Sequence, residues 1–109
     1  MDYGLIKSFV DEIVQKYETR DVFLIAEKAG AAIIYESWHP ATIGEFEEKT
    51  NTIRVNLNAL EKAENVEEQR KKIVAHELGH FLAIDLRLEK SEEEKFAHLF
   101  AEALLEKDG

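Results

Sequence analysis

The stretch KKIVAHELGHFLAID, residues 71–85, decides how this chain folds. It contains the pattern H-E-x-x-H as His76, Glu77 and His80, set among apolar residues at helical spacing. Residues four apart lie one turn above each other on a helix, so both imidazoles can converge on one metal ion. Glu77 is rotated by about 100° from His76, which suits contact with a water molecule better than metal ligation. The stretch predicts a helix that carries two metal ligands and a general base.

The surrounding sequence predicts that this helix runs from about 66 to 84. Asn65 and Glu68 have the spacing of a capping box at its start. Gly79 lies inside the helix, where glycine costs about 1 kcal/mol relative to alanine. It therefore indicates that another backbone passes close to this turn.

A third metal ligand must come from elsewhere, because a catalytic zinc has three protein ligands and one open position. The chain has no cysteine, so only His, Asp and Glu are available. The stretch SEEEKFAHLFAEALL, residues 91–105, predicts a last helix over about 91–106 that places Glu94 and Ala97 on one face. The small Ala97 would let this helix lie against Gly79. The acidic run that contains Glu94 is the expected source of the third ligand.

Two alternatives stay open on this helix. Glu93 could replace Glu94 as the ligand, or Glu94 could instead close a capping box with Ser91. His98, one turn beyond Glu94, is expected to steady a ligand side chain from outside the coordination sphere. It could also be a fourth ligand, which would close the site to water.

The rest of the chain predicts two helices followed by a small sheet. Apolar residues at spacings of three and four predict a helix over 4–18, and Asp21 and Gly30 can cap and end a short helix over 21–28. Strand-forming segments then follow, which we expect to form a three-stranded antiparallel meander: AAIIYESW (31–38), ATIGEFEEKTN (41–51) and TIRVNLN (52–58). The prediction is an α+β fold in one domain spanning 1–109.

Composition limits the classes of partner. The formal net charge of −9 repels nucleic-acid phosphate and anionic membrane. No stretch has the length of a membrane span, and the first residues lack the basic start and apolar run of a signal peptide. We therefore expect a cytoplasmic protein that binds neither nucleic acid nor membrane directly.

HELGH at 76–80, followed by EKFAHLFAEALL at 94–105, resembles the ImmA/IrrE family of zinc metallopeptidases, whose last motif is E-x-x-A-N-x-F-A-x-x-L-L. The segments IAEKAGAAIIY and TIGEFEEKTNTIRVNLN also resemble that family. The resemblance implies a zincin-like fold, zinc held by His76, His80 and Glu94, and catalysis by Glu77. It implies a helix-turn-helix transcriptional repressor as the substrate. Position 98 is His where the family usually has Asn.

Other functions remain possible from the sequence. The same fold could be a non-catalytic regulatory binding module with a structural or absent metal, or H-E-x-x-H could be fortuitous in an interaction domain. His39 and Tyr35 could stabilise an oxyanion, or could be an ordinary loop histidine and a core tyrosine.

Overall fold

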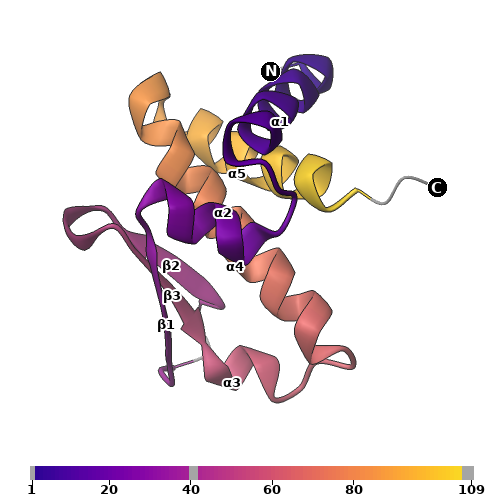
Figure 1. Ribbon diagram of the computed structural model, residues 1–109. Coiled ribbons are helices and arrows are strands. Elements are labelled where there is room, and N and C mark those ends of the chain that lie inside the picture. The colour runs from indigo at the N-terminus through magenta and orange to yellow at the C-terminus, as the bar shows by residue number, and fades with distance from the viewer. Residues whose placement is uncertain (1, 40–41, 107–109) are drawn as a thin grey trace.

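The computed structural model describes residues 2–39 and 42–106. These residues form an α+β structure of helices and one small sheet, as predicted (Figure 1). In chain order the elements are α1 (Tyr3–Tyr17), α2 (Val22–Ala29), β1 (Ala32–Glu36), β2 (Gly44–Glu47), the 3-10 turn η1 (Glu48–Thr50), β3 (Thr52–Asn56), α3 (Leu57–Leu60), α4 (Val66–Ala83), the 3-10 turn η2 (Ile84–Leu86) and α5 (Lys90–Leu105). The first residue of the predicted strand 41–51 and both chain ends lie outside the described residues.

Local capping signals explain where the helices begin and end. The Asp21 carboxylate accepts hydrogen bonds from the backbone N–H groups at the start of α2, and Gly30 ends that helix with a φ of 94°. The Asn65 side chain accepts from the backbone N–H of Glu68 at the start of α4. The predicted caps at Asp21, Gly30 and Asn65 are confirmed. The capping box is only half formed in the described residues, because the Glu68 carboxylate lies near Lys72 and not at the Asn65 backbone. The short helix α3 and the turn η2 were not predicted.

The prediction of an antiparallel meander is wrong, because the sheet is mixed. Its strand order is β1-β3-β2, with β2 antiparallel and β1 parallel to β3. Burial explains the order: Ile53 and Val55 of β3 are completely buried, so this strand gains most from a neighbour on each side. The acidic β2, with sequence GEFE, lies at an edge, where charged side chains remain hydrated.

Helix α4 lies at the centre of the molecule. It contacts the sheet through β2 and β3 on one side and α5 on the other, and α1 packs against α5 (Figure 1). Phe9 of α1 makes edge-on contacts with Phe96 and Phe100 of α5. Arg20 donates to the last backbone carbonyls of α5, which lack helical partners. No helix within the described residues is both long and apolar enough to cross a membrane.

Candidate metal centre

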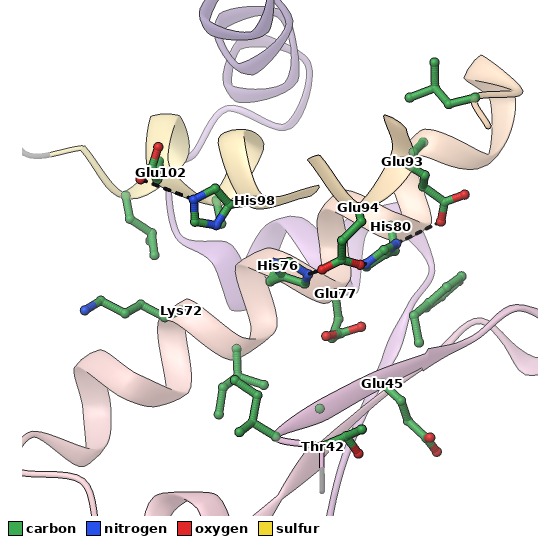
Figure 2. Close-up of a pocket in the computed structure, with 18 of the residues that line it drawn as sticks. Thr42, Glu45, Lys72, His76, Glu77, His80, Glu93, Glu94, His98 and Glu102 are labelled. Carbon is green, nitrogen blue, oxygen red and sulfur yellow. Dashed lines mark hydrogen bonds and ion pairs between the residues drawn. The ribbon is translucent and has the colours of Figure 1, made fainter. Parts of the chain in front are cut away.

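Helix α4 holds His76 and His80 on one face, as their spacing predicts. Their ring centroids are 5.1 Å apart, and both side chains are half-buried on the side that faces α5 (Figure 2). The ladder of backbone hydrogen bonds fixes the separation of these two residues. The helix alone therefore determines how far apart His76 and His80 lie.

The close approach of α5 to this face depends on two small residues. A Cβ atom built on Gly79 would lie 2.8 Å from Cα and 3.2 Å from Cβ of Ala97. No side chain larger than hydrogen fits between the helices there. The predicted contact between Gly79 and Ala97 is confirmed, and it brings the first turns of α5 over the histidines.

The Glu94 carboxylate bridges the two histidines. Its Oε1 lies 2.8 Å from Nε2 of His76, and its Oε2 lies 2.9 Å from Nε2 of His80 (Figure 2). One ligand atom from each of the three residues lies within 4.8 Å of the others. This cluster could hold a metal ion, and its two imidazoles and one carboxylate are a donor set that transition metals accept.

Glu93 contacts the other side of the same imidazole. Its Oε1 lies 2.8 Å from Nδ1 of His80, so the Nδ1–H donates to this carboxylate. A hydrogen bond at Nδ1 orients the ring and favours the tautomer whose Nε2 lone pair is free for a metal. Glu93 therefore lies where it can orient His80, and Glu94 lies where it can act as a ligand.

The alternative in which Glu94 caps the helix is not formed. Helix α5 begins at Lys90 after Glu89, so Ser91 lies inside the first turn. The carboxylate of Glu94 reaches the histidines of α4 instead. The adjacent residues Glu93 and Glu94 contact different nitrogen atoms of the histidines. Local sequence patterns cannot predict which of the two glutamates contacts which nitrogen.

Glu77 is buried between α4 and β2, with only 8% of its surface exposed. Burial raises the pKa of its carboxyl to about 7, His80 opposes this shift, and the Glu94 and Glu45 carboxylates add to it. Glu77 makes no hydrogen bond or ion pair with another residue in the described part of the chain. A carboxyl group with a pKa near neutrality can both accept and release a proton.

Gly44 at the start of β2 creates this burial. A Cβ atom at Gly44 would lie 2.6 Å from Cγ2 of Ile73 and 3.5 Å from Cγ of Glu77. The strand can therefore lie directly against α4 only because this residue has no side chain. The role of Gly44 was not predicted, although a glycine within a strand is a known signal of close backbone approach.

The His76 imidazole is also adapted to ligation. Burial lowers the pKa of His76 below its usual value, while the neighbouring Glu94 carboxylate opposes that shift. A lowered pKa keeps the ring neutral near pH 7, and only a neutral imidazole has a lone pair for a metal.

The cluster lies in an open cleft of about 1350 Å³ between α4, α5 and β2. His98 lies on the cleft wall, 64% exposed, and its partner is Glu102, with 3.6 Å between Nε2 and Oε1 (Figure 2). Among the described residues, His98 makes no hydrogen bond or ion pair with any of the three candidate ligands. The proposed contact of His98 with a ligand is therefore not formed here.

The two candidate oxyanion donors do not line the cleft. The Tyr35 hydroxyl accepts a hydrogen bond from Arg70 at 3.4 Å, on the outer strand β1. The backbone carbonyl of His39 is held by the buried Asn56 side chain, which also binds the carbonyls of Trp38 and Thr42. Asn56, which was not singled out from the sequence, thus fixes the loop that leads into β2.

No protein-family model, curated protein or solved structure matches the chain.

Proposed function

We propose that this chain is a cytoplasmic zinc-dependent endopeptidase that cleaves a protein substrate. The observation that carries the proposal is the convergence of His76, His80 and Glu94 beside the buried Glu77 carboxylate. Two histidines and one glutamate are the ligands of a known class of catalytic zinc site. The resemblance of the two helical motifs to the ImmA/IrrE family and its zincin-like fold also supports it.

A bound zinc ion would supply a Lewis acid for the scissile carbonyl and lower the pKa of water to about 7. Glu77 takes the proton of the attacking water on a carboxylate oxygen. It then delivers this proton to the nitrogen of the leaving amine, and the peptide C–N bond breaks. The burial that raises the pKa of Glu77 makes both transfers favourable near neutral pH.

The substrate binds as an extended strand along the free edge of β2. The strand segments 42–47 and 52–57 are both candidates for this edge, but β3, which spans 52–56, already has a neighbour on each side in the described sheet. β2 has only β3 as a neighbour there, and its residues Gly44, Glu45 and Phe46 line the cleft. Strand addition at a sheet edge is a common mode of peptide binding.

The substrate that we propose is a helix-turn-helix transcriptional repressor, on the ground of the family resemblance. The chain is incubated with a purified helix-turn-helix repressor, and cleavage is followed by mass spectrometry. Zinc content is measured for the wild type and for His76→Ala and Glu77→Gln. We expect about one zinc per chain in the wild type and in Glu77→Gln, and a loss of zinc in His76→Ala.

Cleavage should require both the zinc and Glu77. If Glu77→Gln retains zinc and cleaves at the wild-type rate, the proposed mechanism is wrong. A chain that binds zinc but cleaves no partner would instead be the non-catalytic regulatory module.

A further inference from the structure

The cleft carries carboxylates well away from the metal centre. Glu45 and Glu48 line it on the sheet side, and Glu102 and Glu106 line it along the end of α5. Their side chains reach solvent. They are not needed to hold the metal or to move the proton. Glu45, Glu102 and Glu106 pair with Arg54, His98 and Lys7 respectively. These exposed pairs are weak, so a cation that enters the cleft can replace the partner within the chain.

Cations of the chain offset only part of this charge. Seven glutamates line the cleft among the described residues, together with the two cations Lys72 and Arg87. Lys72 also lies near Glu68, with 3.7 Å between Nζ and Oε1, and Arg54 and Lys7 reach Glu45 and Glu106 from outside the lining. The carboxylates still outnumber these four cations, and low-dielectric walls concentrate the field of such an excess.

The carboxylates on α5 stand at the edge of an apolar surface. Glu94, His98 and Glu102 repeat every four residues along one face of the helix, and Ala101 and Leu105 line the same part of the cleft. Lysine and arginine side chains match such a surface, since their stems bury apolar area while the charged end reaches a carboxylate.

One corner of the cleft already binds an ammonium group of the chain itself. Lys7 of α1 places Nζ 3.3 Å from Oε2 of Glu106 and 5.9 Å from the ring centroid of Tyr3. Both Tyr3 and Glu106 line the cleft. An aromatic ring beside a carboxylate attracts a cation through two separate interactions.

The floor of the cleft also presents an acceptor. The Glu77 side chain lines the cleft and makes no hydrogen bond within the described part of the chain (Figure 2). Its carboxylate opens into the cleft, so water or an occupant of the cleft can donate hydrogen bonds to it.

We infer that the cleft selects a substrate segment rich in lysine and arginine. This inference rests on the proposed function, because it assumes that the cleft binds a polypeptide beside the metal centre. Proteins that contact DNA carry such segments to neutralise phosphate. A repressor would therefore present the charge that this cleft attracts, and the chain would compete with DNA for the same surface.

The test compares binding of two fluorescein-labelled decapeptides, one alternating alanine with lysine and one alternating alanine with glutamate. Fluorescence anisotropy is measured with zinc-loaded, full-length chain carrying Glu77→Gln, so that neither peptide is hydrolysed. We expect the lysine peptide to bind at least about tenfold more tightly at low salt, with a preference that falls as salt rises.

Charge-reversal variants locate the binding. Glu102→Lys and Glu106→Lys together should weaken binding of the lysine peptide by about tenfold or more. The matched control reverses Glu12 and Glu27, which are exposed on α1 and α2 and do not line the cleft. The double variant Glu102→Gln and Glu106→Gln should also weaken binding of the lysine peptide, and it is less likely to disturb folding. A melting curve of each variant checks that it is folded.

Equal affinity for the two peptides would overturn the inference. So would equal losses in the cleft and control variants, because binding would then reflect the overall charge of the chain. These results differ from a failure of the proposed function: a chain that prefers the lysine peptide but cleaves no protein refutes the protease only. Cleavage without a charge preference refutes the charge selection only.

Discussion

Two elements contact α4 from opposite sides: α5, which we call the helical wall, and β2, which we call the strand wall. Each approaches α4 at a glycine, but the two contacts have different consequences for the candidate site. On one side Gly79 lets α5 approach so closely that an added Cβ would lie 2.8 Å from Ala97 Cα. On the other side Gly44 lets β2 approach, and a Cβ added there would lie 2.6 Å from Ile73 Cγ2. The helical wall brings Glu94 to the histidines, whereas the strand wall buries Glu77.

This difference teaches that the contact that brings the candidate ligands together is separate from the contact that buries Glu77. Substitutions on each wall should therefore change different measured properties.

The largest expected effect is on the helical wall. Glu94→Ala removes a candidate ligand and should reduce zinc affinity by about a thousandfold, measured by competition with a chromophoric chelator. Glu93→Gln replaces the charged acceptor for the Nδ1–H of His80 with a weaker, neutral amide oxygen and should cost about 10- to 100-fold. If Glu93→Gln loses more zinc affinity than Glu94→Ala, then Glu93 is the ligand and Glu94 is not.

Glu77→Gln tests the strand wall through the pH dependence of stability. Burial raises the pKa of Glu77 to about 7, so the native state holds a proton that the unfolded state has released above its ordinary pKa. The free energy of unfolding of the metal-free wild type should fall relative to Glu77→Gln, by about 3 kcal/mol in total, as pH rises from about 4.5 to about 7, and should level off above that. Urea unfolding at several pH values measures this difference.

The control for this experiment is Glu12→Gln, which removes one exposed carboxylate from α1. If the difference between the wild type and Glu77→Gln stays constant with pH, the burial of Glu77 does not perturb its titration.

Gly79→Ala should destabilise the helical wall by about 2 kcal/mol. The added methyl group meets the backbone of α5, and the gain in helix propensity of about 1 kcal/mol offsets only part of the clash. Thermal unfolding of the metal-free chain measures the loss, and zinc affinity should fall with it because α5 moves. Unchanged zinc affinity would show that the ligands do not depend on this contact.

The smallest expected effect is that of Gly44→Ala, about 1 kcal/mol, because an edge strand can move outward more easily than a buried helix. Zinc affinity should stay close to that of the wild type, since none of the three candidate ligands contacts Gly44. Hydrogen exchange of the β2 amides should become faster. A loss of zinc as large as that of Gly79→Ala would mean that the two walls are coupled.

The candidate site was largely predictable because its main signals are local. The spacing of His76 and His80, the glycine at 79 and the alanine at 97 each follow from helix geometry. The choice between Glu93 and Glu94 was not predictable, since it depends on how α5 is rotated against α4. Adjacent residues on a helix point about 100° apart, and only packing decides which one reaches the histidines.

The sequence by itself determined the longer helices α1, α2, α4 and α5, the caps at Asp21, Gly30 and Asn65 and the pair of motifs, because periodicity and capping act within a few residues. The tertiary structure alone decided the sheet order, the burial of Glu77 under Gly44 and the hold of Asn56 on the loop before β2. Strand pairing joins segments far apart in the chain, and a strand carries no local mark of its neighbours. The most buried strand, β3, lies at the centre of the sheet, because a strand with a neighbour on each side buries more apolar surface than a strand with one neighbour.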